Sequence, residues 1–360
     1  MNATPAPIPA SAPAPIPTPT PTPATAVLAI DGGNSKTDVA LIARDGALLA
    51  HVTGPGSNAQ QIGVDRAFAV LSSLVAKAVE RGGLSDRWKP GTPIAEYTLA
   101  CLAGADFPEE EEFLAAAVDA RGWSPAGRVV NDTFAVLRAG APDGWGVAVT
   151  CGAGINCVGV APDGRVARFP ALGRITGDWG GGSDLSQDVL WWASRAEDGR
   201  GPATALAKGV TDHFGTATVQ EAAAGIHFNR IPSARVHALT YVLLATAAAG
   251  DPIALTLTER MAQEVVCMAT AAATRLGLAD EPLDVVLGGG LMRARDPLLT
   301  AALHAALTRD LPKARTHILD LPPIVGAGML GLDHVAVPGA GAAAHLRAEF
   351  TPPPRSGRTN

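Results

Sequence analysis

The first stretch that could do chemistry is a carboxylate followed by a glycine-rich, polar turn. Asp31 follows the apolar run 27–30, and Gly32 and Gly33 come directly after it. Such a turn exposes backbone N–H groups against which a phosphate chain can lie, and the carboxylate can hold a metal ion directly or through water. An ordinary hairpin turn explains this stretch equally well, because short glycine motifs have a high false-positive rate. The turn continues with Asn34, Ser35, Lys36 and Thr37.

This pattern of strand, glycine turn and strand occurs twice in the chain. In the first copy, the apolar runs 27–30 and 39–43 flank the turn, and an Asp-Gly turn at Asp45 leads to a third predicted strand, 47–53. Asp-Gly between apolar runs is a strong hairpin signal. Two such units suggest two related halves that face one nucleotide. The second copy consists of the runs 146–150, 155–160 and 165–169, the turn Gly152-Ala153-Gly154 and the Asp-Gly turn at Asp163.

A further candidate is Asp132, in the segment Asn131-Asp132-Thr133. A short predicted strand, 128–130, precedes it, and a predicted helix, 133–139, follows it. A carboxylate at a strand end can accept a proton from a reacting group. The same residue types would also cap the helix, so the local pattern leaves both roles open.

The elements that must position these residues alternate between strands and helices, which indicates a mixed α/β architecture. Amphipathic helices are predicted at 64–81 and 252–276. Pro108 and the acidic run 109–112 mark another helix start, where negative charge meets the positive end of the helix dipole, so we expect solvated glutamates there. Asp106 could contact the site, but a helix cap is the favoured interpretation. Other predicted elements are strands at 97–103, 283–287 and 317–321 and a helix at 326–334.

Taken in order, these segments resemble the actin, hexokinase and heat-shock-chaperone ATPase superfamily, and within it the N-acetylglucosamine kinase and BadF-type ATPase branch. The resemblance extends from about residue 27 to residue 333. It implies an α/β fold with two ribonuclease-H-like domains of the actin/hexokinase type, which face an interdomain nucleotide cleft. The matching segments are 31–37, 130–133, 151–156, 177–180, 287–290 and 324–328.

The resemblance also predicts how the chain is divided. We expect an N-terminal actin-like ATPase domain at 26–138 and a C-terminal one at 139–335, which carries a helical insert at 183–250. Residues 1–25 consist mainly of Pro, Ala and Thr and are expected to be disordered, because such a segment cannot bury a core. The segment 336–360 is expected to be largely loose.

By resemblance, single residues receive roles in an ATP-dependent reaction. Asp132 is expected to be the general base for a sugar hydroxyl, and Asp31 to hold Mg²⁺. ATP is expected to lie between the two glycine turns. The expected sugar-binding residues are Asn58, Asn156, Gly173 and Asp178. The expected nucleotide-binding residues are Gly32, Gly33, Asn34, Ser35, Lys36, Thr37, Gly152, Ala153, Gly154, Gly289 and Gly290.

Two residues depart from the family pattern. Ala153 stands where Thr or Ser is usual, so nucleotide contact there must be made by the backbone. Leu172 stands where the amino-sugar kinases have an aromatic residue, which leaves the shape of the acyl pocket open. Asn58 would serve equally well as a turn former, and Trp179 could cover one sugar face or lie in a core.

Composition narrows the partners. The net charge is -6 and no long basic patch occurs, which argues against a nucleic-acid partner. The sequence contains no run of 18 apolar residues, so no membrane span is expected, and residues 1–25 lack the features of a signal peptide. The four cysteines are widely spaced in apolar runs, which is typical of buried, reduced thiols. We therefore expect a cytoplasmic protein. The resemblance to the kinase branch implies a small-molecule sugar as the substrate, and we expect a homodimer.

Three functions remain open from the sequence. The first is a sugar kinase that converts N-acetyl-D-glucosamine to its 6-phosphate, with glucosamine or glucose as close variants. The second is a BadF-type ATPase activator, which drives electron transfer into a partner enzyme and holds an iron–sulfur cluster through cysteines at a dimer interface. The third is a sugar-sensing binding protein, which the lack of a helix-turn-helix before residue 27 disfavours.

Overall fold

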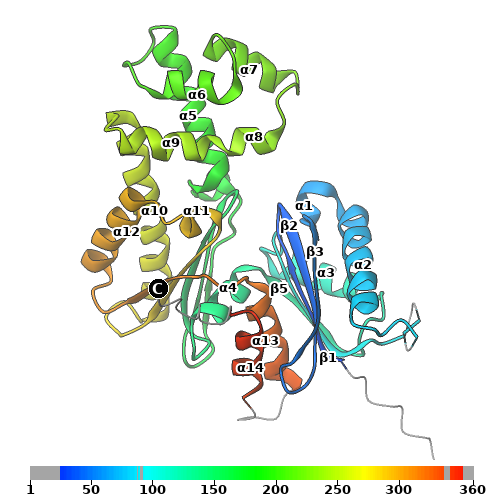
Figure 1. Ribbon diagram of the computed structural model, residues 1–360. Coiled ribbons are helices and arrows are strands. Elements are labelled where there is room, and N and C mark those ends of the chain that lie inside the picture. Colours follow the sequence, from blue (N-terminus) through cyan, green and yellow to red (C-terminus); the bar gives the residue numbers. More distant parts are fainter. Residues whose placement is uncertain (1–24, 87, 90–91, 336–340, 352–360) are drawn as a thin grey trace, which may run out of the picture.

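Two five-stranded sheets with helices on their faces make up the body of the protein. The computed structural model, which describes residues 25–86, 88–89, 92–335 and 341–351, places the sheets in two lobes (Figure 1). A group of helices extends from the second lobe, away from its sheet. The predicted α/β fold with two domains is therefore confirmed.

The first sheet has β1 at its centre, with the order β3-β2-β1-β4-β5. β1 pairs antiparallel with β2 and parallel with β4, and β4 pairs parallel with β5. Because helices cover both faces, β1 is buried along its whole length, and residues 26–30 form an unbroken apolar run. The strands are β1 (Thr25–Gly32), β2 (Lys36–Ile42), β3 (Leu48–Pro55), β4 (Ala95–Leu102) and β5 (Gly127–Asn131), and the helices are α1 (Ala59–Ile62), α2 (Val64–Arg81) and α3 (Pro108–Asp119).

The second sheet repeats this topology. Read from β8, its order is β8-β7-β6-β9-β10. This matches the first sheet strand for strand, with β6 in the place of β1. β6 likewise pairs antiparallel with β7 and parallel with β9. The duplication seen in the sequence is thus a duplication of structure. The strands are β6 (Gly146–Cys151), β7 (Ile155–Val160), β8 (Val166–Arg168), β9 (Asp284–Gly288) and β10 (Arg315–Ile318).

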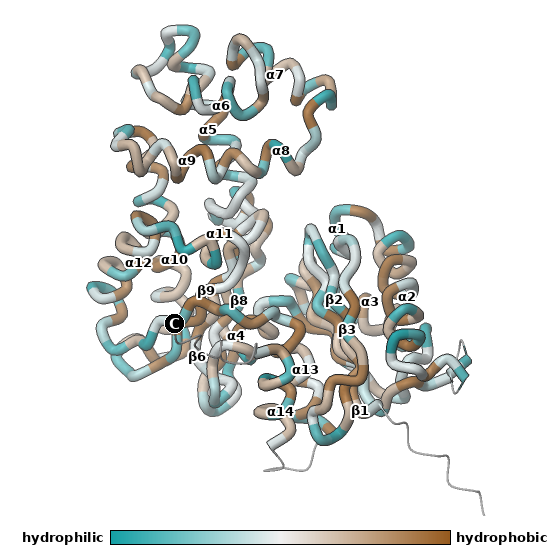
Figure 2. Tube along the Cα trace, in the orientation of Figure 1, coloured by the Kyte–Doolittle hydropathy of each residue, from teal (hydrophilic) through white to brown (hydrophobic). Residues whose placement is uncertain are grey.

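Helices cover the outer face of the second sheet and form the extension. α10 (Pro252–Leu276) begins after Asp251, whose carboxylate accepts hydrogen bonds from the N–H groups of Ile253 and Ala254. Figure 2 shows that hydrophobic and hydrophilic residues alternate along this helix. Further helices are α11 (Gly290–Arg293) and α12 (Pro297–Asp310). The extension consists of α5 (Gly181–Glu197), α6 (Leu206–Phe214), α7 (Val219–His227), α8 (Ser233–His237) and α9 (Leu239–Ala248).

Two helices cross between the sheets. α4 (Thr133–Gly140) packs on the inner face of the second sheet, and α13 (Ile324–Val335) packs on the inner face of the first. At the crossing, a Cβ placed on Gly326 would lie 1.8 Å from the carbonyl oxygen of Ala135. Only a residue without a side chain permits this approach, so Gly326 fixes how closely the two domains join.

The C-terminal segment differs from its prediction. Residues 342–349 form a helix, α14 (Ala342–Glu349), in which Ala342 and Leu346 are buried against the cluster that contains α13 and β1. The expectation of a largely loose segment is therefore wrong for these residues, because an apolar pair at helical spacing finds a partner surface. Residues 336–340 and 352–360 lie outside the described residues.

Smaller differences concern element ends and one thiol. The last strand, β10, spans Arg315–Ile318 rather than 317–321, and only the N–H of Leu319 continues its pairing, donating to the carbonyl of Leu287 at 2.9 Å. Thr25 is buried and begins β1, whereas it was expected in the disordered tail; residues 1–24 are outside the described part. Cys267, expected to be buried, is exposed on α10.

Within the described ranges, no single helix is long and apolar enough to cross a membrane. Helices α8 and α9 pass the same test only in combination with α10, to which they are bent by 116°.

Replacing Gly326 by Ala should destabilise the protein, because the new methyl group must displace the backbone of α4. Overpacking of this kind typically costs about 1–3 kcal/mol in free energy of unfolding, which urea denaturation measures. The matched control is Gly82→Ala, at the end of α2, where the atom nearest to the new methyl group would be 3.3 Å away. Equal stability of the two variants would contradict the close crossing.

Candidate functional site

Three carboxylates gather where neighbouring parallel strands of the first sheet end. Asp31 lies near the end of β1, Asp106 is in the loop after β4, and Asp132 directly follows β5. The register sets the last residues of these three strands side by side. Because the carboxyl ends of parallel strands meet at one edge of a sheet, residues distant in the sequence come together there.

The electrostatics of this edge are unusual for carboxylates. Burial, followed by the negative charges of Asp132 and Asp38, raises the pKa of Asp31 to about 8. Burial raises the pKa of Asp132 to about 6. Burial, followed by the charges of Asp132 and Glu110, raises the pKa of Asp106 to about 7. These carboxyl groups therefore keep their protons to a higher pH than ordinary aspartates, and a bound cation would favour their charged forms.

Asp132 occupies the N-cap position of α4 but does not act as its cap. Its side chain makes no capping hydrogen bond. Instead, the Oδ1 atom of Asn131 accepts hydrogen bonds from the Thr133 N–H at 3.0 Å and the Thr133 hydroxyl at 2.6 Å. Because Asn131 takes over the capping role, the carboxylate of Asp132 is left available for chemistry.

The first glycine turn joins β1 to β2. The N–H of Gly33 donates to the carbonyl of Lys36 at 2.9 Å, and the carbonyl of Gly33 accepts from the N–H of Ser57 at 3.1 Å. Thr37 is fully buried, and its hydroxyl donates to Ser57 Oγ at 2.8 Å, so this side chain does not face a ligand. The exposed residues of the turn are Asn34, Ser35 and Lys36.

The second glycine turn joins β6 to β7 and lies against the N-terminus of α5. Its carbonyl groups accept hydrogen bonds from that helix, Gly152 from the Gly182 N–H at 2.9 Å and Ala153 from the Ser183 N–H at 2.8 Å. Gly152 and Gly154 are exposed. The carbonyl groups of the turn thus satisfy the first N–H groups of α5 and fix the turn against this helix, while the exposed backbone at Gly154 stays accessible.

A third glycine segment lies next to the second turn. Gly289, between β9 and α11, has φ +91°, and a Cβ on it would lie 2.0 Å from the carbonyl oxygen of Cys151. This position requires glycine on both counts. Gly290 has open space around it. The predicted nucleotide-binding residues of the second domain are therefore brought together around the end of β6.

One predicted sugar-binding residue connects the two domains. Asn156, at the start of β7, directs its Nδ2 atom to Oδ1 of Asn131 at 3.3 Å and to Oδ1 of Asp106 at 3.5 Å. Asp106 also accepts from Nδ2 of Asn131 at 2.8 Å and from Nε2 of Gln60 at 3.3 Å. The favoured role of Asp106 as a helix cap is wrong, because the carboxylate of Glu110 caps α3 while Asp106 links four segments.

The other predicted sugar-binding residues lie in two different settings. Asn58 caps α1, accepting from the Gln60 N–H at 2.8 Å, and its Nδ2 atom donates to Asn34 Oδ1 at 2.6 Å, so most of its polar capacity is used internally. Gly173 and Asp178 belong to one surface loop, in which the Asp178 N–H donates to the Gly173 carbonyl at 3.1 Å. Trp179 is buried in the second core, which excludes a place over a sugar face.

The site offers partial coordination for a metal ion. Among the residues that the structure describes, no three His, Cys, Asp or Glu side chains converge on one metal position. Mg²⁺ is usually held by one or two carboxylates together with substrate phosphates, so Asp31 in its negative surroundings fits such an ion. Positive charge from Lys36 and Arg293 already lowers the pKa of Asp31, against the larger effect of burial. Arg293 belongs to the second domain and was not predicted from the sequence.

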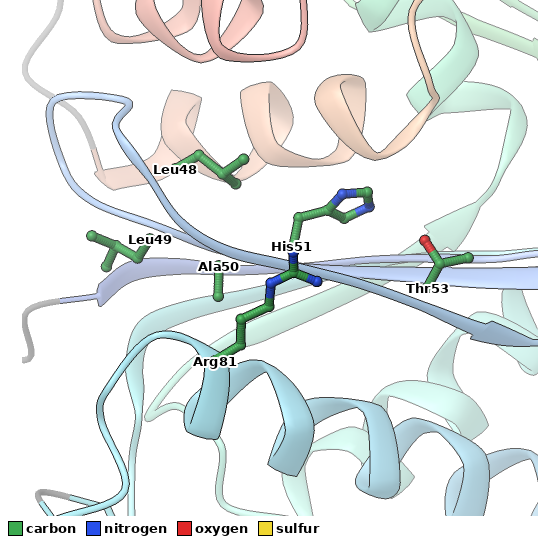
Figure 3. A pocket seen from close by; sticks show the side chains of 6 residues that line it. All are labelled: Leu48, Leu49, Ala50, His51, Thr53 and Arg81. Atoms are coloured by element: carbon green, nitrogen blue, oxygen red, sulfur yellow. The ribbon is translucent and has the colours of Figure 1, made fainter.

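A hollow of about 610 Å³ lies elsewhere, along β3 (Figure 3). His51 and Thr53 point to the same side of this strand, and Arg81 reaches it from the end of α2. Nε2 of His51 lies 3.1 Å from Oδ1 of Asp38, which also accepts from the Thr53 hydroxyl. None of the predicted site residues lines this hollow, so it is separate from the carboxylate edge.

Comparison with known proteins decides the family. The model of the BadF/BadG/BcrA/BcrD ATPase family matches residues 28–331. The chain belongs to this family. It is 25% identical over 268 residues to an N-acetylmuramic acid/N-acetylglucosamine kinase of Clostridium acetobutylicum, covering 74% of this chain and 85% of that protein. The family predicted from the ordered motifs is therefore confirmed.

Two further relatives support the same grouping. An N-acetyl-D-glucosamine kinase of Dictyostelium discoideum is 24% identical over 312 residues, covering 85% of this chain and 97% of that protein. A crystal structure from Chromobacterium violaceum, of a protein proposed to be an N-acetylglucosamine kinase, superposes with a TM-score of 0.67 at 24% identity, covering 85% of this chain and 99% of that chain. The latter shows the fold of this BadF-family protein.

Replacing Asp132 by Asn should lower the pKa of Asp31 from its value of about 8, because one of the negative charges that raise it is removed. Carbon-13 NMR of the aspartate carboxyl groups across a pH titration measures the shift. The control is Asp163→Asn, an exposed carboxylate paired with Arg165. An Asp31 pKa that is equal in both variants would show that the two carboxylates do not interact.

Proposed function

We propose that this protein is an ATP-dependent sugar kinase that transfers the γ-phosphoryl group to the 6-hydroxyl of an amino sugar, N-acetyl-D-glucosamine in the first place. The observation that carries the proposal is the half-buried carboxylate of Asp132, which directly follows β5, makes no capping hydrogen bond and raises the pKa of Asp106 through its charge. Membership of the BadF family and the names of the relatives support it. Phosphoryl transfer depends chiefly on positioning and charge neutralisation, and this site offers both.

ATP is proposed to lie between the two glycine turns. Gly32, Gly33 and the exposed residues 34–36 would approach its phosphates from the first domain, and the turn 152–154 would do so from the second. Gly289 and Gly290 would allow the backbone to approach the adenosine. The hydroxyl of Thr37 is buried and donates to Ser57, so it is not offered to the phosphates. Mg²⁺, bound through Asp31 and phosphate oxygens, would neutralise charge on the transferred group.

The sugar is proposed to bind beside Asp132. In this scheme the carboxylate accepts the proton of the 6-hydroxyl as the phosphoryl group moves to that oxygen. Asn156, Gly173 and Asp178 would hold the other hydroxyl groups from the second domain. Asn58 would act mainly through Asn34, because its own side chain is engaged in the cap of α1.

The BadF-type activator function is less well supported. An intersubunit iron–sulfur cluster needs thiolates at a surface, but Cys101, Cys151 and Cys157 are buried. Burial raises the pKa of the Cys151 thiol to about 12, which keeps it protonated. Cys267 is exposed but lies within α10. Buried free thiols suit the cytoplasm, which we propose as the location, with a homodimer as the state to be tested by light scattering.

A coupled assay of ADP release tests the substrate. We expect the highest kcat/KM for N-acetylglucosamine within a panel that also contains glucosamine, glucose, N-acetylmannosamine and N-acetylmuramic acid. N-acetylmuramic acid is included because it appears in the name of the Clostridium relative. Identical ADP release with and without every sugar would contradict the kinase proposal and favour an ATPase. Preference for another sugar would correct the substrate alone.

Replacing Asp132 by Asn should lower kcat by about 10²-fold, the lower part of the range for loss of a general base, because positioning contributes so much to this reaction. The amide still forms hydrogen bonds, so the KM for sugar should change little. In the native enzyme, kcat/KM should rise with pH through about 6, since the carboxyl group must lose its proton to act.

The control for this variant is Asp163→Asn, which should retain native rates. The rise of kcat/KM near pH 6 should disappear in Asp132→Asn. A variant with a lower melting temperature and a kcat within a few-fold of the native value would show a structural role only.

A further inference from the structure

One side chain of the second domain contacts the first domain beside Asp106, one of the three carboxylates described above. Arg168, the last residue of β8, is held at its backbone by α10, because Nη1 of Arg275 donates to its carbonyl oxygen at 3.1 Å. Its guanidinium donates through Nη2 to the carbonyl of Ala105 at 2.9 Å and to that of Asp106 at 3.3 Å. Nη1 of the same group forms an ion pair of 2.9 Å with Oε1 of Glu111.

Glu111 carries this contact to the segment that contains Asp132. The same atom, Oε1, accepts a hydrogen bond from the backbone N–H of Asn131 at 3.2 Å. The side chains of Arg168 and Glu111 are only 24% and 18% exposed. One carboxylate oxygen thus connects a cation of the second domain to the peptide group of Asn131. This is not the solvated role expected for the acidic run 109–112.

Asn131 is held by the second domain at its side chain as well. Its Oδ1 atom accepts from Nδ2 of Asn156 at 3.3 Å, while its Nδ2 atom donates to Asp106 at 2.8 Å. β7 and β8 are neighbouring strands, so Asn156 and Arg168 approach from one sheet edge. The residue immediately before Asp132 is therefore fixed by groups from both domains.

We propose that Arg168 and Glu111 form an interdomain clamp that positions the Asn131–Asp132 segment for phosphoryl transfer. Both are positioning residues, acting through Asn131 rather than on substrate. The inference rests on the proposed role of Asp132 as general base. Small misplacements of a reacting group are costly in rate, so a contact that sets this backbone should affect kcat. Because Arg168 belongs to the second domain and Glu111 to the first, the position of Asp132 also depends on how the two domains are placed relative to each other.

The test is a set of variants assayed with ATP and the preferred sugar of the panel. Arg168→Met removes the charge but keeps a similar apolar stem, and Glu111→Gln keeps an oxygen that can accept from Asn131 while removing the ion pair. Each should lower kcat by about 10-fold or more, with the KM for ATP nearly unchanged. The double variant should be no slower than the slower single variant. Arg168→Lys should recover part of the rate, because it restores the charge.

The matched control is Arg165→Met, in the turn between β7 and β8. Arg165 pairs with Asp163 within one exposed turn, at 2.8 Å, and does not join the domains. It should leave both kcat and melting temperature at their native values. If Arg168→Met does not fold, Arg168→Lys and Glu111→Gln give the same comparison. A native kcat in Arg168→Met, or effects of the two single changes that multiply in the double variant, would overturn the clamp.

Failure of the clamp and failure of the general base give different results. A native kcat in Arg168→Met together with a slow Asp132→Asn enzyme rejects the clamp alone. A native kcat in Asp132→Asn rejects the general base, whatever Arg168→Met does, and with it the purpose assigned to the clamp.

Discussion

The partial withdrawal of three carboxylates from water, with Asp31 buried and Asp106 and Asp132 half-buried at the ends of parallel strands, is the constraint on which this site depends. Desolvation disfavours the charged forms of Asp31, Asp106 and Asp132, and the charge of Asp132 further raises the pKa values of Asp31 and Asp106. The fold tolerates this cost because polar side chains and a second domain surround the edge. Such surroundings suit a reaction in which positive charge and a proton acceptor must be supplied together.

The polar groups around that edge have separate hydrogen-bond partners, and the carboxylate of Asp132 is left without a capping bond. Asn131 satisfies the N–H and hydroxyl of Thr133, which would otherwise compete for Asp132. Glu110 caps α3, and Glu111 leaves the same helix turn to contact the backbone before Asp132. Neighbouring residues of one acidic run thus have different partners, because a helix points successive side chains in different directions.

Glycine provides the second condition, close approach of backbones. Gly289 lies against Cys151, and Gly326 lies against α4, at distances that no side chain would permit. The first approach brings the glycine segments of the second domain together around one strand end. The second approach sets the spacing of the crossed helices that join the domains, and hence the distance over which Asn156 and Arg168 must reach.

The sequence by itself determined the repeated units, the amphipathic helices and the family, because apolar periodicity and turn residues act over a few neighbouring positions. It also indicated Asp31 and Asp132, since each stands at a strand end. It did not reveal that Thr37 is buried, that Asn131 replaces Asp132 as the cap, or that Arg168 meets Glu111. The role of Asn131 is local, but its residue types permit either side chain to cap; the burial of Thr37 and the contact of Arg168 with Glu111 depend on strand register and on the packing of one domain against the other. Partners separated by tens of residues are chosen by that packing, which no local pattern encodes.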